Sequence, residues 1–176
     1  MTEDQRLTIR QALLADAEAL RELAARIYYE TFASVNTPEN MNAYLTTAFT
    51  LTQVQSELIE SASTFYLAEM DTQLAGYAKL MASSEVPACI TGKAPVELVR
   101  FYIDRVWQGT GLASALMEHC LNEAKRQGFS TMYLGVWEHN TRAQAFYRKW
   151  DFVRVGEHIF QMGDDLQTDW WMMRSI

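Results

Sequence analysis

Apolar residues recur along the chain at two spacings, one typical of helices and the other of strands. The clearest helical run follows a glycine-rich turn, and Gly128 provides a suitable stop at its end. Its apolar positions are Leu112, Ala113, Leu116, Met117, Cys120, Leu121 and Ala124. Residues 96–103, just before the turn, are β-branched and aromatic, which predicts a strand. The pattern therefore places a strand, a glycine turn and an amphipathic helix one after another.

The same criteria predict further helices and strands on both sides of this unit. Helices are expected to begin after Asp16 as N-cap, at Pro38, after Thr50 and after Asn140. Asp71-Thr72 is typical of a hairpin turn. The additional strands are expected at residues 7–10, 64–68, 74–81, 131–137, 153–160 and 170–174.

The resulting element order is β-α-α-α-β-β-β-α-β-α-β-β. It predicts an α/β (α+β) fold in which a mixed, mostly antiparallel central sheet is flanked by helices. A loop with Pro87 and Gly92 is expected over residues 83–94. The length of 176 residues fits one domain, residues 1–176, with a single well-buried core.

Composition narrows the classes of function. The formal net charge of −7 argues against a nucleic-acid surface, and no apolar run is long enough to cross a bilayer. Residues 1–6 are too acidic and polar for a signal peptide, so a cytoplasmic location is expected. Cys89 and Cys120 do not have the spacing of a metal site, and Cys120 fits the apolar stripe of the central helix. No metal is expected.

The turn itself, Gln108-Gly109-Thr110-Gly111-Leu112-Ala113, is suited to binding an anion. A strand leading through glycines into a helix presents unpaired N–H groups and the positive end of the helix dipole. Ser114 stands where a dinucleotide-binding fingerprint would have its third glycine. The Gly-Lys-Ser/Thr pairing of nucleotide triphosphatases is also absent.

Two ordered motifs carry a resemblance to a known family. In the first, Gln-x-x-Gly-x-Ala, the matching residues are Gln108, Gly111 and Ala113. In the second, Asn-x-x-Ala-x-x-Phe-Tyr followed by a phenylalanine, they are Asn140, Ala143, Phe146, Tyr147 and Phe152. Asp151 stands where the family usually has glycine. With both motifs at the expected separation, the chain resembles the GNAT superfamily of acetyl-CoA-dependent N-acetyltransferases, whose fold agrees with the predicted order of elements.

The resemblance implies roles for named residues. The backbone of Gln108, Gly109, Thr110, Gly111, Leu112 and Ala113 would wrap the pyrophosphate of coenzyme A. A bulge in the preceding strand, matched to Phe101, Tyr102 and Ile103, would bind the pantetheine arm and the acetyl oxygen through backbone N–H groups. Asn140 would contact the pantetheine, with Ala143 and Phe146 beside it. Tyr147 would act as the general acid that protonates the sulfur.

The resemblance gives a less specific indication of the general base that deprotonates the amine. Glu97 lies on the central strand, where many relatives place a base that acts through water; the alternative is an edge or surface carboxylate. Glu138 and His139 are further candidates, whereas His119 and His158 receive no role. Tyr28, Tyr29, Trp170 and Trp171 are either walls of a pocket for a cationic amine or core residues.

Three functions follow from the resemblance. The first is acetylation of a primary amine on a small molecule such as a polyamine, since the chain loosely resembles bacterial spermidine/spermine N-acetyltransferases. The second is acetylation of a protein N-terminus or lysine, which requires an open groove. The third is a coenzyme A-binding sensor without turnover, against which the presence of Tyr147 argues. Members of this superfamily are often homodimers, and no membrane or nucleic-acid partner is expected.

Overall fold

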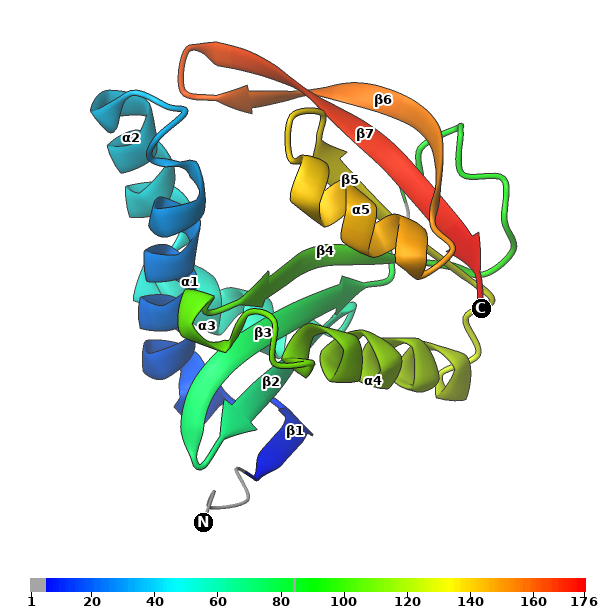
Figure 1. Ribbon diagram of the computed structural model, residues 1–176, viewed down its shortest axis with the longest axis horizontal. Helices are drawn as coiled ribbons and strands as arrows, with labels where there is room; N and C mark the ends of the chain where they lie inside the picture. The colour runs from blue at the N-terminus through cyan, green and yellow to red at the C-terminus, as the bar shows by residue number, and fades with distance from the viewer. Residues whose placement is uncertain (1–5, 84) are drawn as a thin grey trace.

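A seven-stranded sheet runs through the computed structural model in the order β1-β2-β3-β4-β5-β7-β6 (Figure 1). The strands are β1 (Leu7–Gln11), β2 (Ser63–Met70), β3 (Gln73–Met81), β4 (Pro95–Ile103), β5 (Thr131–Trp137), β6 (Val153–Met162) and β7 (Asp165–Ser175). Neighbouring strands are antiparallel except β4 and β5, which are parallel. The predicted mixed, mostly antiparallel sheet is confirmed.

The structure describes residues 6–83 and 85–176. Met1–Gln5 lie outside the described residues, and they form most of the segment that is not expected to be a signal peptide. Ser84, in the predicted loop, also lies outside them. The helices are α1 (Ala17–Phe32), α2 (Pro38–Ala48), α3 (Leu51–Ile59), α4 (Leu112–Arg126), α5 (Thr141–Lys149) and two short 3₁₀ turns, Leu14–Asp16 and Arg105–Trp107. Within the described ranges, no helix combines the length and the apolar character needed to cross a bilayer.

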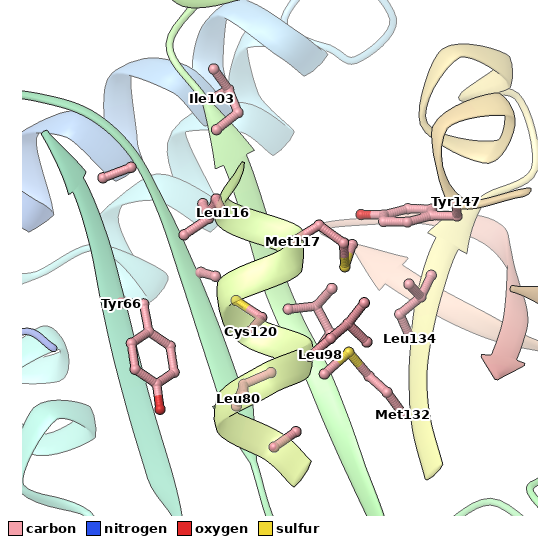
Figure 2. Packing of buried hydrophobic residues seen from close by; sticks show 14 of the residues in the cluster. Tyr66, Leu80, Leu98, Ile103, Leu116, Met117, Cys120, Met132, Leu134 and Tyr147 are labelled. Atoms are coloured by element: carbon pink, nitrogen blue, oxygen red, sulfur yellow. The ribbon is translucent and has the colours of Figure 1, made fainter. Parts of the chain in front are cut away.

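The helices cover the two faces of the sheet and create two apolar cores. On one face, α4 packs Leu116, Met117 and Cys120 against Leu98 of β4 and Met132 of β5 (Figure 2). Cys120 is fully buried there, as its place on the apolar stripe predicts. On the other face, α1, α2 and α3 bury a second cluster against β2 and β3.

Most helix starts follow the sequence signals. Thr37 caps α2 ahead of Pro38, and Thr50 caps α3, each through a side-chain oxygen that accepts a backbone N–H. Asp16 does precede α1, but the prediction that it caps this helix is wrong. Its carboxylate accepts the N–H of Leu13 at 2.7 Å and pairs with Arg10 at 2.8 Å, because a 3₁₀ turn already begins ahead of α1.

Two hairpins complete the sheet. Asp71 and Thr72 form the turn between β2 and β3 with φ values of 49° and 75°, as predicted. The last two strands are longer than predicted, and their pairing extends to Met162 and Asp165 around Gly163. Residues 165–169 are mostly polar, and their sequence does not predict a strand. They nevertheless pair with β6, because the hydrogen bonds between strands need only the backbone.

The feature that creates a site is the divergence of β4 and β5. Their parallel pairing covers only three positions, from Pro95 with Thr131 to Glu97 with Tyr133. Beyond these positions the two strands separate (Figure 1). Val99 is the extra residue of a bulge in β4, since Lys79 pairs with Arg100 and Leu80 with Leu98. From the bulge onward, one edge of β4 faces the opening instead of another strand.

Candidate active site

A cavity of about 730 Å³ occupies the opening between β4 and β5. Most of the predicted site residues line it, and they come from β4, the glycine turn, α4 and α5. These residues are Glu97, Phe101, Tyr102, Ile103, Gln108, Gly109, Ala113, Asn140, Ala143, Phe146 and Tyr147. Thr110, Gly111 and Leu112 belong to the same turn but do not line the cavity, and the Leu112 side chain is buried in the core.

The glycine turn is shaped by backbone conformation. Gly109 and Gly111 have φ values of 83° and 92°, which L side chains rarely adopt. A Cβ built on either glycine would meet nothing within 4 Å, so glycine is required here by its φ and not by a crowded neighbour. Gly111 is the N-cap of α4, and the first N–H groups of that helix therefore point out of the turn. This end of the cavity is suited to an anion.

Side chains hold the turn in place and add positive charge. The Gln108 amide donates to the Ile103 carbonyl at 3.2 Å and accepts a hydrogen bond from the Arg142 guanidinium at 2.6 Å. Thr110 donates its hydroxyl to the Trp107 carbonyl at 2.7 Å. Arg105 and Arg142 both line the cavity, so two cations lie near the helix start. The sequence interpretation missed these arginines, because neither belongs to a motif position.

The edge of β4 supplies the long wall of the cavity. Phe101, Tyr102 and Ile103 pair with β3 on one side and lie beyond the reach of β5 on the other. The bulge predicted at these three residues is instead at Val99, so that prediction is wrong in position. Phe101 stacks on Phe146 with 5.5 Å between ring centroids, which joins this wall to α5.

Tyr147 lies where β4, α4 and α5 meet. Its ring contacts Phe101 and Phe152 at centroid distances of 6.4 and 5.8 Å, and its hydroxyl points across the opening towards Met117 (Figure 2). Burial raises the pKa of the hydroxyl, which therefore holds its proton at neutral pH. Asn140 caps the same helix by accepting the Ala143 N–H at 3.1 Å. The hydroxyl thus has a proton to donate, and its raised pKa also makes it a weaker acid than an ordinary tyrosine.

Comparison with known proteins identifies the family. The pattern of the acetyltransferase (GNAT) family matches residues 17–152. The chain belongs to this GNAT family. It is 30% identical over 154 residues to an uncharacterized N-acetyltransferase in the pepI 3′ region of Lactobacillus delbrueckii subsp. lactis, a match that covers 88% of each chain. An uncharacterized N-acetyltransferase of Mycobacterium tuberculosis is 28% identical over 163 residues, which are 93% of this chain and 99% of that one.

Solved structures agree with the fold. PaiA N-acetyltransferase from Thermoplasma acidophilum, in complex with coenzyme A, superposes with a TM-score of 0.77 at 19% identity, covering 97% of this chain and 99% of that chain. The ribosomal-protein-S18-alanine N-acetyltransferase of Escherichia coli superposes with a TM-score of 0.68 at 18% identity, covering 97% and 94%. Membership of the GNAT family makes this protein an acyltransferase that depends on acetyl-CoA.

The GNAT cavity has two sides. We call the surface formed by residues 101–103, 108–113 and 140–147 the cofactor side. The opposite surface, the acceptor side, combines residues from α1, α2, β4 and the last three strands. Its residues are Tyr28, Phe32, Tyr44, Phe49, Arg100, Trp137, His158, Phe160, Gln167, Asp169 and Trp171. Tyr28 and Trp171 line the cavity as one prediction proposed, whereas Tyr29 and Trp170 do not.

Three acidic residues line the cavity: Glu30, Glu97 and Asp169. Glu97 lies where β4 and β5 still pair, and the Tyr133 hydroxyl donates to it at 3.4 Å. Burial raises the pKa of Glu97, and burial likewise raises that of Asp169 on the acceptor side. Glu138 and His139, the other candidate bases, do not line the cavity.

The two histidines without a predicted role differ in position. His119 contacts Tyr66 edge-on at 4.9 Å, away from the cavity. His158 lines the cavity and stacks on Trp171 at 4.1 Å. Gly135 leaves room for this ring, because a Cβ there would lie 3.3 Å from the His158 Nε2. A glycine in the interior of a strand, two positions from Tyr133 on one side and from Trp137 on the other, was the signal that could have located His158.

Proposed function

We propose that this GNAT protein transfers the acetyl group of acetyl-CoA to a primary amine of a small molecule. The observation that supports a small acceptor is the closure of the acceptor side by the β6–β7 hairpin. The tip of this hairpin lies beside α2 (Figure 1). Gln167 of β7 donates to the Asn36 amide at 2.7 Å, and the Asp164 N–H donates to Asn40 at 3.4 Å.

Aromatic and sulfur contacts reinforce this closure. Tyr44 of α2 meets Phe160 of β6 edge-on at 6.0 Å, and the Tyr28 hydroxyl contacts the Met162 sulfur at 3.8 Å. A peptide acceptor would need an open groove at this end, and the hairpin bridges it. This favours a small molecule over a protein N-terminus or lysine. The Escherichia coli neighbour that acts on ribosomal protein S18 shares the fold, and at its low identity the likeness extends no further.

The cofactor side offers a place for each part of acetyl-CoA. The N–H groups of Gln108–Ala113, with Arg105 and Arg142 nearby, suit the pyrophosphate. The free edge of β4 from Phe101 to Ile103 suits the pantetheine amides and the thioester carbonyl, with Asn140, Ala143 and Phe146 on the opposite wall. Each of these assignments uses groups that face the cavity or frame the turn.

The chemistry requires the amine to lose a proton before it attacks. In our proposal Glu97 accepts that proton through water, and the neutral nitrogen forms a bond with the acetyl carbon. The carbon–sulfur bond then breaks, and Tyr147 donates its proton to the departing thiolate. The nitrogen then carries two protons and a positive charge; one of them returns to the Tyr147 oxygen, and the product amide keeps the other, which balances the transfer. A homodimer, a cytoplasmic location and a polyamine acceptor stay predictions from the sequence.

Thermal denaturation with acetyl-CoA tests the binding step. At a concentration of 100 Kd, acetyl-CoA should stabilise the protein by about 2.7 kcal/mol, which corresponds to a rise in Tm of roughly 5–11 °C. Gly111→Ala should reduce this rise, and amine-dependent release of thiol should accompany binding in the wild type. Binding without any thiol release would support the coenzyme A sensor instead.

Gly128→Ala is the matched control. Gly128 ends α4 with a φ of 89°, and a Cβ there would also meet nothing within 4 Å. Both substitutions therefore introduce similar backbone strain, but only Gly111 lies in the turn. An equal ligand-induced rise in Tm for the two variants would show that acetyl-CoA binds elsewhere.

A further inference from the structure

We propose that the acceptor carries an anionic group in addition to its amine, with Arg100 binding the anion and Asp169 binding the ammonium. This inference rests on the proposed amine acetylation and narrows its acceptor. The expected chemical class is an amino acid or a related amine that bears a carboxylate or a phosphate. A polyamine, which has only cationic groups, does not fit this class.

Arg100 brings a positive charge that its ion-pair partner Glu57 does not fully balance, because Lys79 pairs with the same carboxylate. Arg100 and Lys79 share one carboxylate, that of Glu57, at 2.8 and 2.9 Å. Two cations and one anion leave one positive charge, although Lys79 and Glu57 are almost fully buried. These cations hold the pKa of Glu57 below its usual value even though burial opposes its ionisation. Within the described part of the chain, the Glu97 carboxylate forms no ion pair with Lys79 or with Arg100.

The Arg100 guanidinium is also accessible to a ligand. It lines the cavity, and its hydrogen bonds to Glu57 use one N–H on each terminal nitrogen. Among residues 6–83 and 85–176, no hydrogen bond involves its Nε. Arginine has five N–H donors, so three remain for an incoming oxyanion. The Phe49 ring lies 5.3 Å from the guanidinium carbon and fixes the side chain from one side.

Asp169 presents the complementary charge on the last strands. It lines the cavity, and its side chain is only 19% exposed. Within the described residues its carboxylate accepts no hydrogen bond, and its one ion-pair contact there is with His158 Nε2 at 4.0 Å, which carries a charge only if the histidine is protonated. Nε2 is itself buried without a partner. A half-buried carboxylate without a donor favours a cationic group as its ligand.

The two charges face one aromatic space. Tyr28 and Tyr44 stack on each other with 4.5 Å between ring centroids, and both line the same cavity as Arg100 and Asp169. Burial raises the pKa of the Tyr44 hydroxyl. The charge of Arg100 lowers this pKa and the charge of Asp169 raises it, so both charges act on the same hydroxyl. A molecule with an ammonium at one end and an anion at the other can therefore contact both groups at once.

Matched pairs of acceptors test the proposal in a thiol-release assay. The pairs are L-phenylalanine with L-phenylalaninamide, γ-aminobutyrate with its amide, and phosphoethanolamine with ethanolamine; putrescine and spermidine are added as purely cationic amines. We expect the anionic member of at least one pair to have a kcat/KM about 10- to 100-fold above its neutral partner, as for the loss of a charge-assisted hydrogen bond. A preference for the anionic member in either of the first two pairs would indicate an acceptor with a carboxylate, and a preference in the third pair would indicate a phosphate.

Two variants assign the charges. Arg100→Gln leaves Glu57 and Lys79 as a balanced pair, and it should remove the preference for the anionic member while neutral amines are still acetylated. Arg100→Lys should restore part of the preference, and Arg154→Gln, on the surface of β6, should change nothing. Asp169→Asn should raise KM for every amine about tenfold or more.

The outcomes distinguish a failure of the anionic-acceptor inference from a failure of the proposed amine acetylation. Acetylation of polyamines or neutral amines at equal or higher kcat/KM would overturn the anionic acceptor and leave amine acetylation standing. Absence of thiol release with every amine, despite the stabilisation by acetyl-CoA, would overturn both. If Arg100→Gln does not fold, the wild-type pairs and Asp169→Asn decide the question.

Discussion

The cofactor side and the acceptor side of the cavity are built in different ways. The cofactor side comes from three short segments: residues 101–103 at the end of β4, the turn at residues 108–113, and residues 140–147. The acceptor side draws on residues from Tyr28 to Trp171, nearly the full length of the chain. The first is defined by local conformation, and the second by how distant elements meet.

This difference matches what each side is proposed to recognise. The cofactor side offers backbone N–H groups, whose direction is set by the positive φ of Gly109 and Gly111 and by the start of α4. The acceptor side offers side chains, so its chemistry depends on strand register. Trp170 and Trp171 are neighbours in β7, and alternation along the strand places only Trp171 in the cavity.

The largest expected effect tests the cofactor side. Tyr147→Phe removes only a hydroxyl from a ring that packs against Phe101 and Phe152. Turnover should fall by a factor within the range of about 10²–10⁴ that is typical for a positioned general acid. The lower end is expected, because a thiol with a pKa of about 8.5 also leaves as the thiolate without assistance. The measurement is kcat together with the affinity for acetyl-CoA.

Tyr29→Phe is the control for this substitution. Tyr29 lies on α1, is 54% exposed and does not line the cavity, so its variant should match the wild type. Full activity of Tyr147→Phe would rule out the acid role. Normal turnover with weakened binding of acetyl-CoA would instead make Tyr147 a binding residue.

The sequence predicts the cofactor side well because its signals are local. The order of strands and helices, the caps at Thr50 and Asn140 and most cavity residues around the turn agree with the structure. The missed features depend on contacts across the chain. The Glu57–Arg100 pair joins positions 43 residues apart, and the Asn36–Gln167 contact spans 131 residues. No pattern within a single element encodes such contacts.

A smaller effect on catalysis is expected from substitution of Glu97, the proposed base. Glu97→Gln should lower kcat/KM about tenfold, less than a directly placed base would contribute. The loss should be greatest above the pKa of Glu97, where the wild-type carboxylate is ionised. Glu138→Gln, outside the cavity, is the control and should be neutral. An unchanged pH–rate profile for Glu97→Gln would remove Glu97 from the mechanism and leave Glu30 and Asp169, the other acidic residues that line the cavity, as candidates.

The same variant has a defined effect on stability. Burial raises the pKa of Glu97 above its ordinary value of 4.5, so the folded state binds its proton more tightly than the unfolded chain does. The wild type therefore loses stability as pH rises from that value through the folded pKa. Relative to the wild type, Glu97→Gln should become more stable as pH rises from about 4.5 through the folded pKa of Glu97. Thermal melts across this range would contradict the assignment if the difference stayed constant or reversed.

The smallest effect concerns the turn that ends α5 and fixes the backbone of Tyr147. The Tyr147 carbonyl accepts the N–H groups of Trp150 at 2.9 Å and Phe152 at 3.1 Å, and Asp151 donates to the Arg148 carbonyl at 3.1 Å. This is a Schellman motif, in which Asp151 has a φ of 61°. Asp151 thus keeps the turn that glycine usually forms in the family.

Two opposing terms decide the outcome of Asp151→Gly. Glycine removes the cost of a left-handed residue, about 1 kcal/mol at the low end that suits aspartate. It also makes the unfolded chain more flexible, which costs about 0.4–1 kcal/mol. The variant should therefore gain no more than about 0.5 kcal/mol, or roughly 1–2 °C in Tm, with unchanged kcat. Asp151→Ala keeps the strain and loses the tolerance of aspartate for this conformation, so it should be the least stable of the three. A clear loss of stability in Asp151→Gly would mean that the aspartate side chain, and not the backbone turn, holds the end of α5 beneath Tyr147.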